Sequence, residues 1–157
     1  METTKGRIKA ISVSKQKGMP KTNVPEADLK TDFGIVGDAH AGNGHRQVSL
    51  LAVESLDKLA IRLAGKLREK GVKTSPGDFA ENIMTEGLDL RALKVGSKLR
   101  LGGRAELEIT QLGKRCHRRC SIFSRLGDCV MPRDGVFARV TGPGRIKVGD
   151  VIEVVDD

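Results

Sequence analysis

The chain has 157 residues, 38% hydrophobic and 31% charged, a composition typical of one soluble globular domain over residues 1–157. Its apolar runs are shorter than the roughly 20 residues that a membrane-spanning helix needs. Its polar start lacks the apolar centre of a secretion signal. Three cysteines cannot all pair with one another, so we expect a cytoplasmic protein without a disulfide framework.

The net charge of +8 is unevenly distributed along the chain. Between Arg91 and Arg125, ten lysines and arginines stand against only two acids, Glu106 and Glu108. A basic surface suits nucleic acid, a phosphate-bearing small molecule or an acidic protein. With no Trp or Tyr and only four Phe, the chain has few side chains on which single-stranded bases can stack. We therefore expect a phosphorylated cofactor rather than nucleic acid.

The first half of the chain predicts two strands and one helix. Residues 7–14 alternate between apolar and polar side chains and residues 32–36 form a second strand, whereas prolines indicate a loop or edge segment over residues 18–25. From Val53 to Leu67, apolar residues recur at steps of three and four, which predicts a long amphipathic helix ending near Gly71. This helix is expected to pack against the core.

The second half predicts short strands separated by glycine turns. Strands are expected over residues 79–84, 94–101, 105–112, 136–140 and 147–154. Residues 94–101 and 147–154 resemble each other, which indicates equivalent strands in a barrel or sandwich. The predicted fold class is mainly β, a closed barrel with one long amphipathic helix and short helical pieces.

Two polar segments interrupt these strands. Residues 37–47 hold three glycines together with Asp38, His40, His45 and Arg46, and are either a ligand-binding loop or a solvated turn. Two histidines and one carboxylate there are a weak signal for a metal. In the second segment, Glu81 and Asn82 lie in an otherwise apolar stretch, so they either bond neighbouring backbone, which is the favoured reading, or face a site.

All three cysteines, Cys116, Cys120 and Cys129, lie in one segment beside His117. Positive charge stabilises a thiolate, so a basic neighbourhood predicts reactive rather than core cysteines. The cations that flank the first two cysteines are Lys114, Arg115, Arg118 and Arg119.

Several uses of these cysteines remain open. Four soft ligands could hold zinc, although the spacing is poor and the cations oppose a dication. An acyl-transfer nucleophile with His40 or His45 as its base is a second use, and ordinary semi-buried thiols are a third. A thiolate that accepts sulfur as a persulfide, or that ligates a soft metal on an anionic cofactor, best accounts for the basic neighbourhood.

Together these segments resemble the MOSC domain, the C-terminal domain of molybdenum cofactor sulfurases, which also occurs as small stand-alone bacterial proteins. The resemblance covers roughly residues 5 to 155. The residues on which it rests are 37–40, 46–51, 76–83 and 87–90, followed by a cysteine after residues 109–113.

The resemblance implies a β-barrel of the pyruvate-kinase type that binds molybdenum cofactor or moves sulfur. By position, Cys116 matches the family's cysteine that carries sulfur or ligates molybdenum. Arg115 stands here where a proline is common in the family, so Cys120 is an alternative reactive residue. Cys120 or Cys129 could also resolve a persulfide by forming a disulfide.

The same resemblance sets expectations for the cofactor. Its phosphate is expected against Arg46, Lys114, Arg115 or Arg118. Its pterin is expected to be oriented by Asp38, His40, Glu81 and Asn82. No pyridoxal phosphate is expected on this chain, so sulfur would come from a partner such as a cysteine desulfurase. The receiving partners would be cofactor assembly proteins or a molybdoenzyme.

Two other functions remain open at this point. One is a small molybdenum-dependent reductase of N-hydroxylated compounds, as some relatives are. The other is a non-enzymatic module that binds nucleic acid through the basic face, with an affinity that falls steeply as salt rises.

Overall fold

The computed structural model describes residues 4–16, 20–42, 44–62, 76–77, 79–113 and 134–155. Within these ranges, seven strands close into a barrel in the order β1–β11–β7–β8–β9–β5–β6 and back to β1. The barrel strands are β1 (Lys5–Val13), β5 (Val48–Ala52), β6 (Ile83–Glu86), β7 (Lys98–Leu101), β8 (Ala105–Leu112), β9 (Val136–Gly142) and β11 (Val151–Val155). A mainly β fold with a closed barrel is therefore confirmed.

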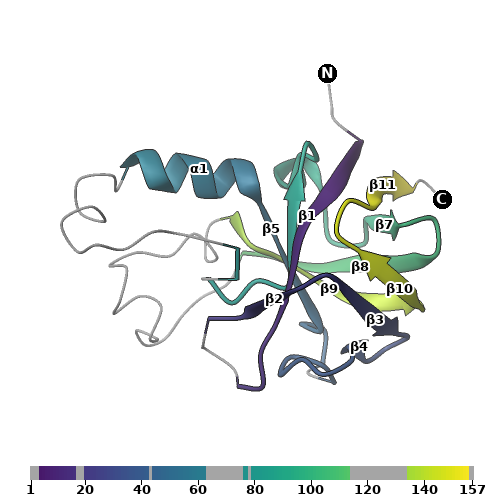
Figure 1. The fold of residues 1–157 in the computed structure, drawn as a ribbon. Helices are drawn as coiled ribbons and strands as arrows, with labels where there is room; N and C mark the ends of the chain where they lie inside the picture. The colour runs from purple at the N-terminus through teal and green to yellow at the C-terminus, as the bar shows by residue number, and fades with distance from the viewer. Residues whose placement is uncertain are drawn as a thin grey trace.

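A closed ring with an odd number of strands cannot be antiparallel throughout. Each antiparallel neighbour reverses the strand direction, and an odd number of reversals cannot return the ring to its starting direction. The parallel step lies between β5 and β6, with Leu50 opposite Ile83. Parallel neighbours need a long crossover, and α1 (Val53–Arg62) begins it by continuing directly from the end of β5 (Figure 1).

The helix is described over ten residues, Val53–Arg62. The rest of the predicted long helix, residues 63–71, lies outside the described residues, so a single long amphipathic helix is not supported. A short helical piece is present as η1 (Leu90–Ala92), a 3-10 turn in which the side chain of Asp89 accepts the amide of Arg91. No helix in the described part of the chain is long and apolar enough to cross a membrane.

A second, three-stranded sheet consists of β10 (Gly144–Lys147), β3 (Glu26–Lys30) and β4 (Gly34–Ile35), which lie beside the barrel (Figure 1). A short strand, β2 (Thr22–Val24), pairs with the end of β1, on the same edge of β1 as β11 and opposite β6. The sequence predicted a loop or edge segment over residues 18–25 and missed β3. Residues 26–30 contain too few apolar positions for a strand to be predicted from alternation of apolar and polar residues.

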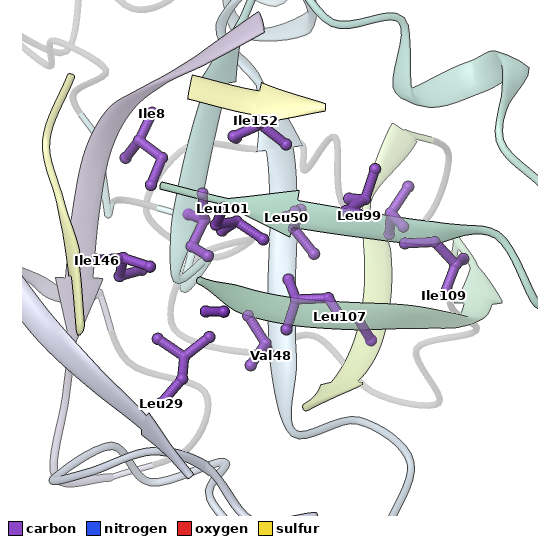
Figure 2. Close-up of a cluster of buried hydrophobic side chains, with 14 of the residues drawn as sticks. Ile8, Leu29, Val48, Leu50, Leu99, Leu101, Leu107, Ile109, Ile146 and Ile152 are labelled. Carbon is purple, nitrogen blue, oxygen red and sulfur yellow. The ribbon is translucent and has the colours of Figure 1, made fainter. Parts of the chain in front are cut away.

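The barrel interior is filled by apolar side chains that alternate along the strands. Leu107 and Ile109 of β8 point inward, beside Leu99 of β7 and Leu50 of β5 (Figure 2). Leu29 of β3 and Ile146 of β10 belong to the same buried cluster, so the small sheet is packed against the barrel core.

Most predicted strands agree with the observed ones. The strand over residues 105–112 is confirmed with the same bounds. The two similar segments, 94–101 and 147–154, contain β7 and all but the last residue of β11. These two strands pair with each other, with Leu101 opposite Ile152. The prediction of a strand over residues 79–84 was wrong for residues 79–82, because Ala80 adopts a positive φ of 64° and β6 begins only at Ile83.

We expect Ile146→Ala to lower the free energy of unfolding by about 2 to 5 kcal/mol, because the truncation leaves a cavity where the small sheet meets the barrel core. Val148→Ala is the matched control, since Val148 is 47% exposed and surface changes stay within about 0.5 kcal/mol. Urea unfolding of both variants measures the difference. If both variants lost the same small amount of unfolding free energy, the small sheet and the barrel would not share a core.

Candidate functional site

The loop after β4 holds a buried ion pair between Asp38 and Lys21. The Lys21 Nζ donates to Asp38 Oδ1 at 2.8 Å, and both side chains are 0% exposed. Gly37 precedes the aspartate with a φ of +90°, a conformation that favours glycine and turns the chain toward β1. Asp38 was predicted from the sequence, whereas Lys21 was missed because a lone lysine between two prolines gives no burial signal.

Three acceptors surround the Lys21 ammonium. Besides Asp38, they are Ser14 Oγ at 3.1 Å and His40 Nδ1 at 3.1 Å. The backbone amides of Ser14 and His40 donate to the two oxygens of the Asp38 carboxylate, at 3.1 and 3.0 Å. Residues from the end of β1, the segment before β2 and the loop after β4 therefore meet at one aspartate.

The electrostatics of this cluster favour a charged carboxylate. Burial by itself raises the pKa of Asp38, but the contacts with His40 and Lys21, the charge of Lys21 and the Ser14 amide outweigh it. The net effect holds the pKa of Asp38 well below its usual range. Asp38 is consequently a carboxylate throughout the physiological pH range.

Arg46 and His45 are held by a single glutamine at the end of β8. Gln111 Oε1 accepts from Arg46 Nε at 2.9 Å and lies 2.9 Å from His45 Nε2, while its Nε2 donates to the carbonyl of Gly113 at 2.7 Å. The Arg46 guanidinium also lies over the Phe137 ring, 5.6 Å from its centre. The other four N–H groups of Arg46 have no partner among the described residues.

Gln111 lies just before the segment that contains the three cysteines, residues 114–134 between Gly113 and Gly135. The Gly113 amide donates to the carbonyl of Gly135 at 2.6 Å, so the two ends of that segment are tied together. The predicted residues within it lie outside the described residues, and nothing is stated of their positions: Lys114, Arg115, Cys116, Arg118, Cys120 and Cys129.

Glu81 and Asn82 are buried and bonded to backbone. Glu81 accepts the amides of Gly77 and Phe79 at 2.7 and 3.1 Å, which fixes the turn before β6. Asn82 Oδ1 accepts the amide of Ser49 at 3.0 Å, and its Nδ2 donates to the carbonyl of Ser12 at 3.1 Å. The side-chain amide of Asn82 therefore links β1 to β5 beside the start of β6. These bonds agree with the structural reading of the sequence, and an orienting role toward a cofactor stays a prediction.

The predicted residues gather in two groups on either side of the start of β5. Asp38 and His40 lie at the end of β1, and the Lys21 amide donates to the Gly77 carbonyl at 2.7 Å, next to the turn held by Glu81. Arg46 lies toward β8 and β9 instead. The hydrogen bonds of Asp38 and His40 stay within the first group, and those of Arg46 stay within the second.

No cluster of three or more His, Cys, Asp or Glu side chains exists among the described residues. His40 and His45 do not converge on a shared site, because they bond to Lys21 and Gln111, respectively. A separate pocket of about 320 Å³ lies between the start of α1 and the loop after β6, and none of the described candidate residues lines it.

Comparison with known proteins identifies relatives of this fold. The family model of the MOSC domain matches residues 37–153. No curated protein matches the chain significantly.

Solved structures resemble the whole chain. The YUAD protein from Bacillus subtilis is 20% identical over 96% of this chain and 95% of its own, with a TM-score of 0.74. YiiM from Escherichia coli is 21% identical over 96% of this chain and 70% of its own, with a TM-score of 0.67. YiiM from Geobacillus stearothermophilus is 19% identical over 96% and 75%, with a TM-score of 0.72. At these identities the likeness concerns the fold.

We expect Asp38→Asn to lower the free energy of unfolding at pH 7 by about 3 kcal/mol, because it leaves the buried Lys21 without its counter-charge. A carboxyl whose pKa is lower in the folded state stabilises the fold above its unfolded pKa, about 3.9, and loses that contribution as the pH falls toward the folded value. The difference between the wild type and the variant should therefore shrink below about pH 4.

Urea unfolding between pH 3 and pH 7 measures this difference. Asp28→Asn is the control, since Asp28 forms an exposed ion pair with Arg145 and such pairs contribute about 1 kcal/mol or less. A loss for Asp38→Asn that is the same at pH 3 and pH 7 would contradict the ionic role of Asp38.

Proposed function

The chain belongs to the MOSC domain family, and we propose that it binds molybdenum cofactor and presents Cys116 to it as a sulfur carrier or ligand. The proposal rests on family membership together with one observation. Among the described residues, only one of the five N–H groups of Arg46 has a partner, and that partner, Gln111, also donates to Gly113, after which the segment that contains Cys116 begins. A cation anchored there is suited to the anionic end of a cofactor whose reactive end meets a thiolate.

The chemistry of the described side chains fits such a group in part. Arg46 offers four N–H donors to a phosphate, and His40, although mostly buried, keeps 17% of its side chain exposed. The described residues offer no cluster of three metal ligands, so a protein ligand to the metal is proposed to come from Cys116. When bound, the cofactor would supply a soft metal centre that a thiolate can ligate.

The residues around Cys116 support a thiolate. Lys114, Arg115 and Arg118 add positive charge within two positions of it, which lowers a thiol pKa. Cys120 is the alternative nucleophile, or the thiol that resolves a persulfide.

Sulfur transfer would need no external oxidant. The Cys116 thiolate attacks the outer sulfur of a persulfide on a donor protein, a new S–S bond forms, and the donor cysteine leaves as a thiolate. A cysteine desulfurase is the proposed donor, and a cofactor assembly protein or a molybdoenzyme is the proposed acceptor.

We expect Cys116→Ser to abolish bound molybdenum or the sulfur adduct while leaving the melting temperature nearly unchanged, because the substitution removes a thiolate and adds no bulk. Elemental analysis and intact mass of anaerobically purified protein measure both. Cys129→Ser is the matched control and should retain the wild-type content.

Each outcome has a distinct meaning. Molybdenum and pterin that disappear in Cys116→Ser indicate cofactor ligation, whereas a reducible adduct of about 32 Da, the mass of one sulfur atom, without metal indicates a persulfide carrier. Retention of full molybdenum or sulfur content by Cys116→Ser would contradict the role of Cys116. Zinc in both proteins would contradict the proposed function.

Arg46→Met should lower the retained cofactor about tenfold, because a hydrogen bond to a charged group contributes about 1.5 kcal/mol or more. Arg104→Met, in the exposed turn at the opposite end of β8, controls for the loss of one positive charge. Pterin fluorescence after denaturation measures the bound fraction. If both variants retained the same fraction of cofactor, Arg46 would not contribute to cofactor binding.

A further inference from the structure

The Lys21 ammonium has a complete and unusual set of neighbours. An ammonium carries three N–H donors and no acceptor. Three acceptors lie around Nζ: Asp38 Oδ1 at 2.8 Å, Ser14 Oγ at 3.1 Å and His40 Nδ1 at 3.1 Å. Ser14 Oγ donates its own hydrogen to the carbonyl of Gln16 at 2.9 Å, which leaves its lone pairs for Lys21.

These contacts decide where His40 holds its proton. A nitrogen that faces an ammonium at hydrogen-bond distance must offer a lone pair, so Nδ1 is the unprotonated nitrogen. A flipped ring would place a carbon atom against the ammonium and leave its third N–H without an acceptor. In the neutral imidazole the proton is then on Nε2.

A second contact of the same nitrogen would favour the opposite arrangement. His40 Nδ1 lies 3.6 Å from Asp38 Oδ2, and a proton on Nδ1 could point toward that oxygen. This separation is longer than a hydrogen bond, and Asp38 Oδ2 already accepts the His40 backbone amide at 3.0 Å. A proton on Nδ1 would also face the Lys21 ammonium at 3.1 Å. The shorter contact, between Nδ1 and Lys21 Nζ, therefore determines the tautomer.

We propose that Lys21 is a positioning residue that holds His40 as the Nε2–H tautomer, so that His40 donates a hydrogen bond to an oxyanion of the ligand. With Nδ1 directed at buried Lys21, Nε2 is the ring nitrogen left for a ligand, and 17% of the His40 side chain is exposed. This N–H has no acceptor among the described residues.

The arrangement separates His40 from two common roles of histidine. A histidine that ligates a metal donates its other N–H to an acceptor, which leaves the ligating nitrogen unprotonated. Here the inner partner is a donor cation, so the outer nitrogen carries the proton. For the same reason Nε2 in this tautomer has no lone pair with which to act as a general base.

The ligand class that follows is an oxyanion such as a phosphate group. A donor N–H supported by a buried cation suits an anionic oxygen. That this oxygen belongs to the phosphate of a bound cofactor rests on the proposed function, whereas the tautomer does not. The two proposals can therefore fail separately.

The test is a long-range ¹H–¹⁵N correlation spectrum of the ¹⁵N-labelled wild-type protein near neutral pH. The chain has three histidines, and the variants His45→Gln and His117→Gln assign the remaining signals to His40. We expect a protonated Nε2 and an unprotonated Nδ1. A protonated Nδ1 in the wild type would overturn the proposal, and this measurement requires no substitution near Lys21.

A variant then tests the role of Lys21. Lys21→Met removes the donor, and we expect the His40 proton to move to Nδ1, toward Asp38. Lys9→Met, which removes an exposed lysine paired with Glu86, should leave all three histidine patterns unchanged. A folded Lys21→Met protein that keeps the Nε2–H pattern would overturn the positioning role.

Inorganic phosphate is the probe for the ligand class, with chloride at equal ionic strength as the control. We expect the His40 Nε2 signal to shift with phosphate and not with chloride. No shift at saturating phosphate would overturn the oxyanion assignment. A correct tautomer and phosphate response in a protein that binds neither molybdenum nor sulfur would support this inference and reject the proposed function.

Discussion

The closure of seven strands into a ring imposes a parallel pairing, which lies between β5 and β6, and much of the molecule follows from it. Because parallel neighbours cannot be joined by a tight turn, the chain must leave the barrel after Ala52 and return at Ile83. The start of β5 then lies near two segments that are far apart in the sequence, the loop after β4, which leads into β5, and the turn before β6. The polar residues of this region are brought together by topology rather than by sequence proximity.

Asn82 secures this junction. Its side chain satisfies one backbone donor on β5 and one backbone acceptor on β1, and its own amide donates to the Ser49 carbonyl at 3.0 Å. All of these groups are buried, where an unpaired polar atom costs about 1 to 3 kcal/mol. The backbone amide of Ser14, two residues after Ser12, donates to the Asp38 carboxylate. The positions of Asp38 and His40 consequently depend on the same strand end that Asn82 holds.

The sequence predicted the barrel because its strands alternate clearly, as in residues 105–112, where Leu107 and Ile109 face the interior. It could not predict β3, because Leu29 is the one deeply buried residue of that strand and a single apolar position has no period. It identified Asp38, His40 and Arg46 as polar residues in a glycine loop. It could not identify Lys21 or Gln111, since their roles arise only when distant segments meet at Asp38 and Arg46.

The distribution of charge changes when the fold is considered. The basic stretch of the sequence between residues 91 and 125 contains β7 and β8, and Arg100 pairs there with Glu106 at 3.2 Å, while Arg139 of β9 pairs with Glu108 at 3.3 Å. Both acids of that stretch are thus matched on the barrel surface. Such exposed pairs add little stability, but they lower the local charge. Gln111, which holds Arg46, also donates to the carbonyl of Gly113, the residue after which the basic run of residues 114–119 begins in the sequence.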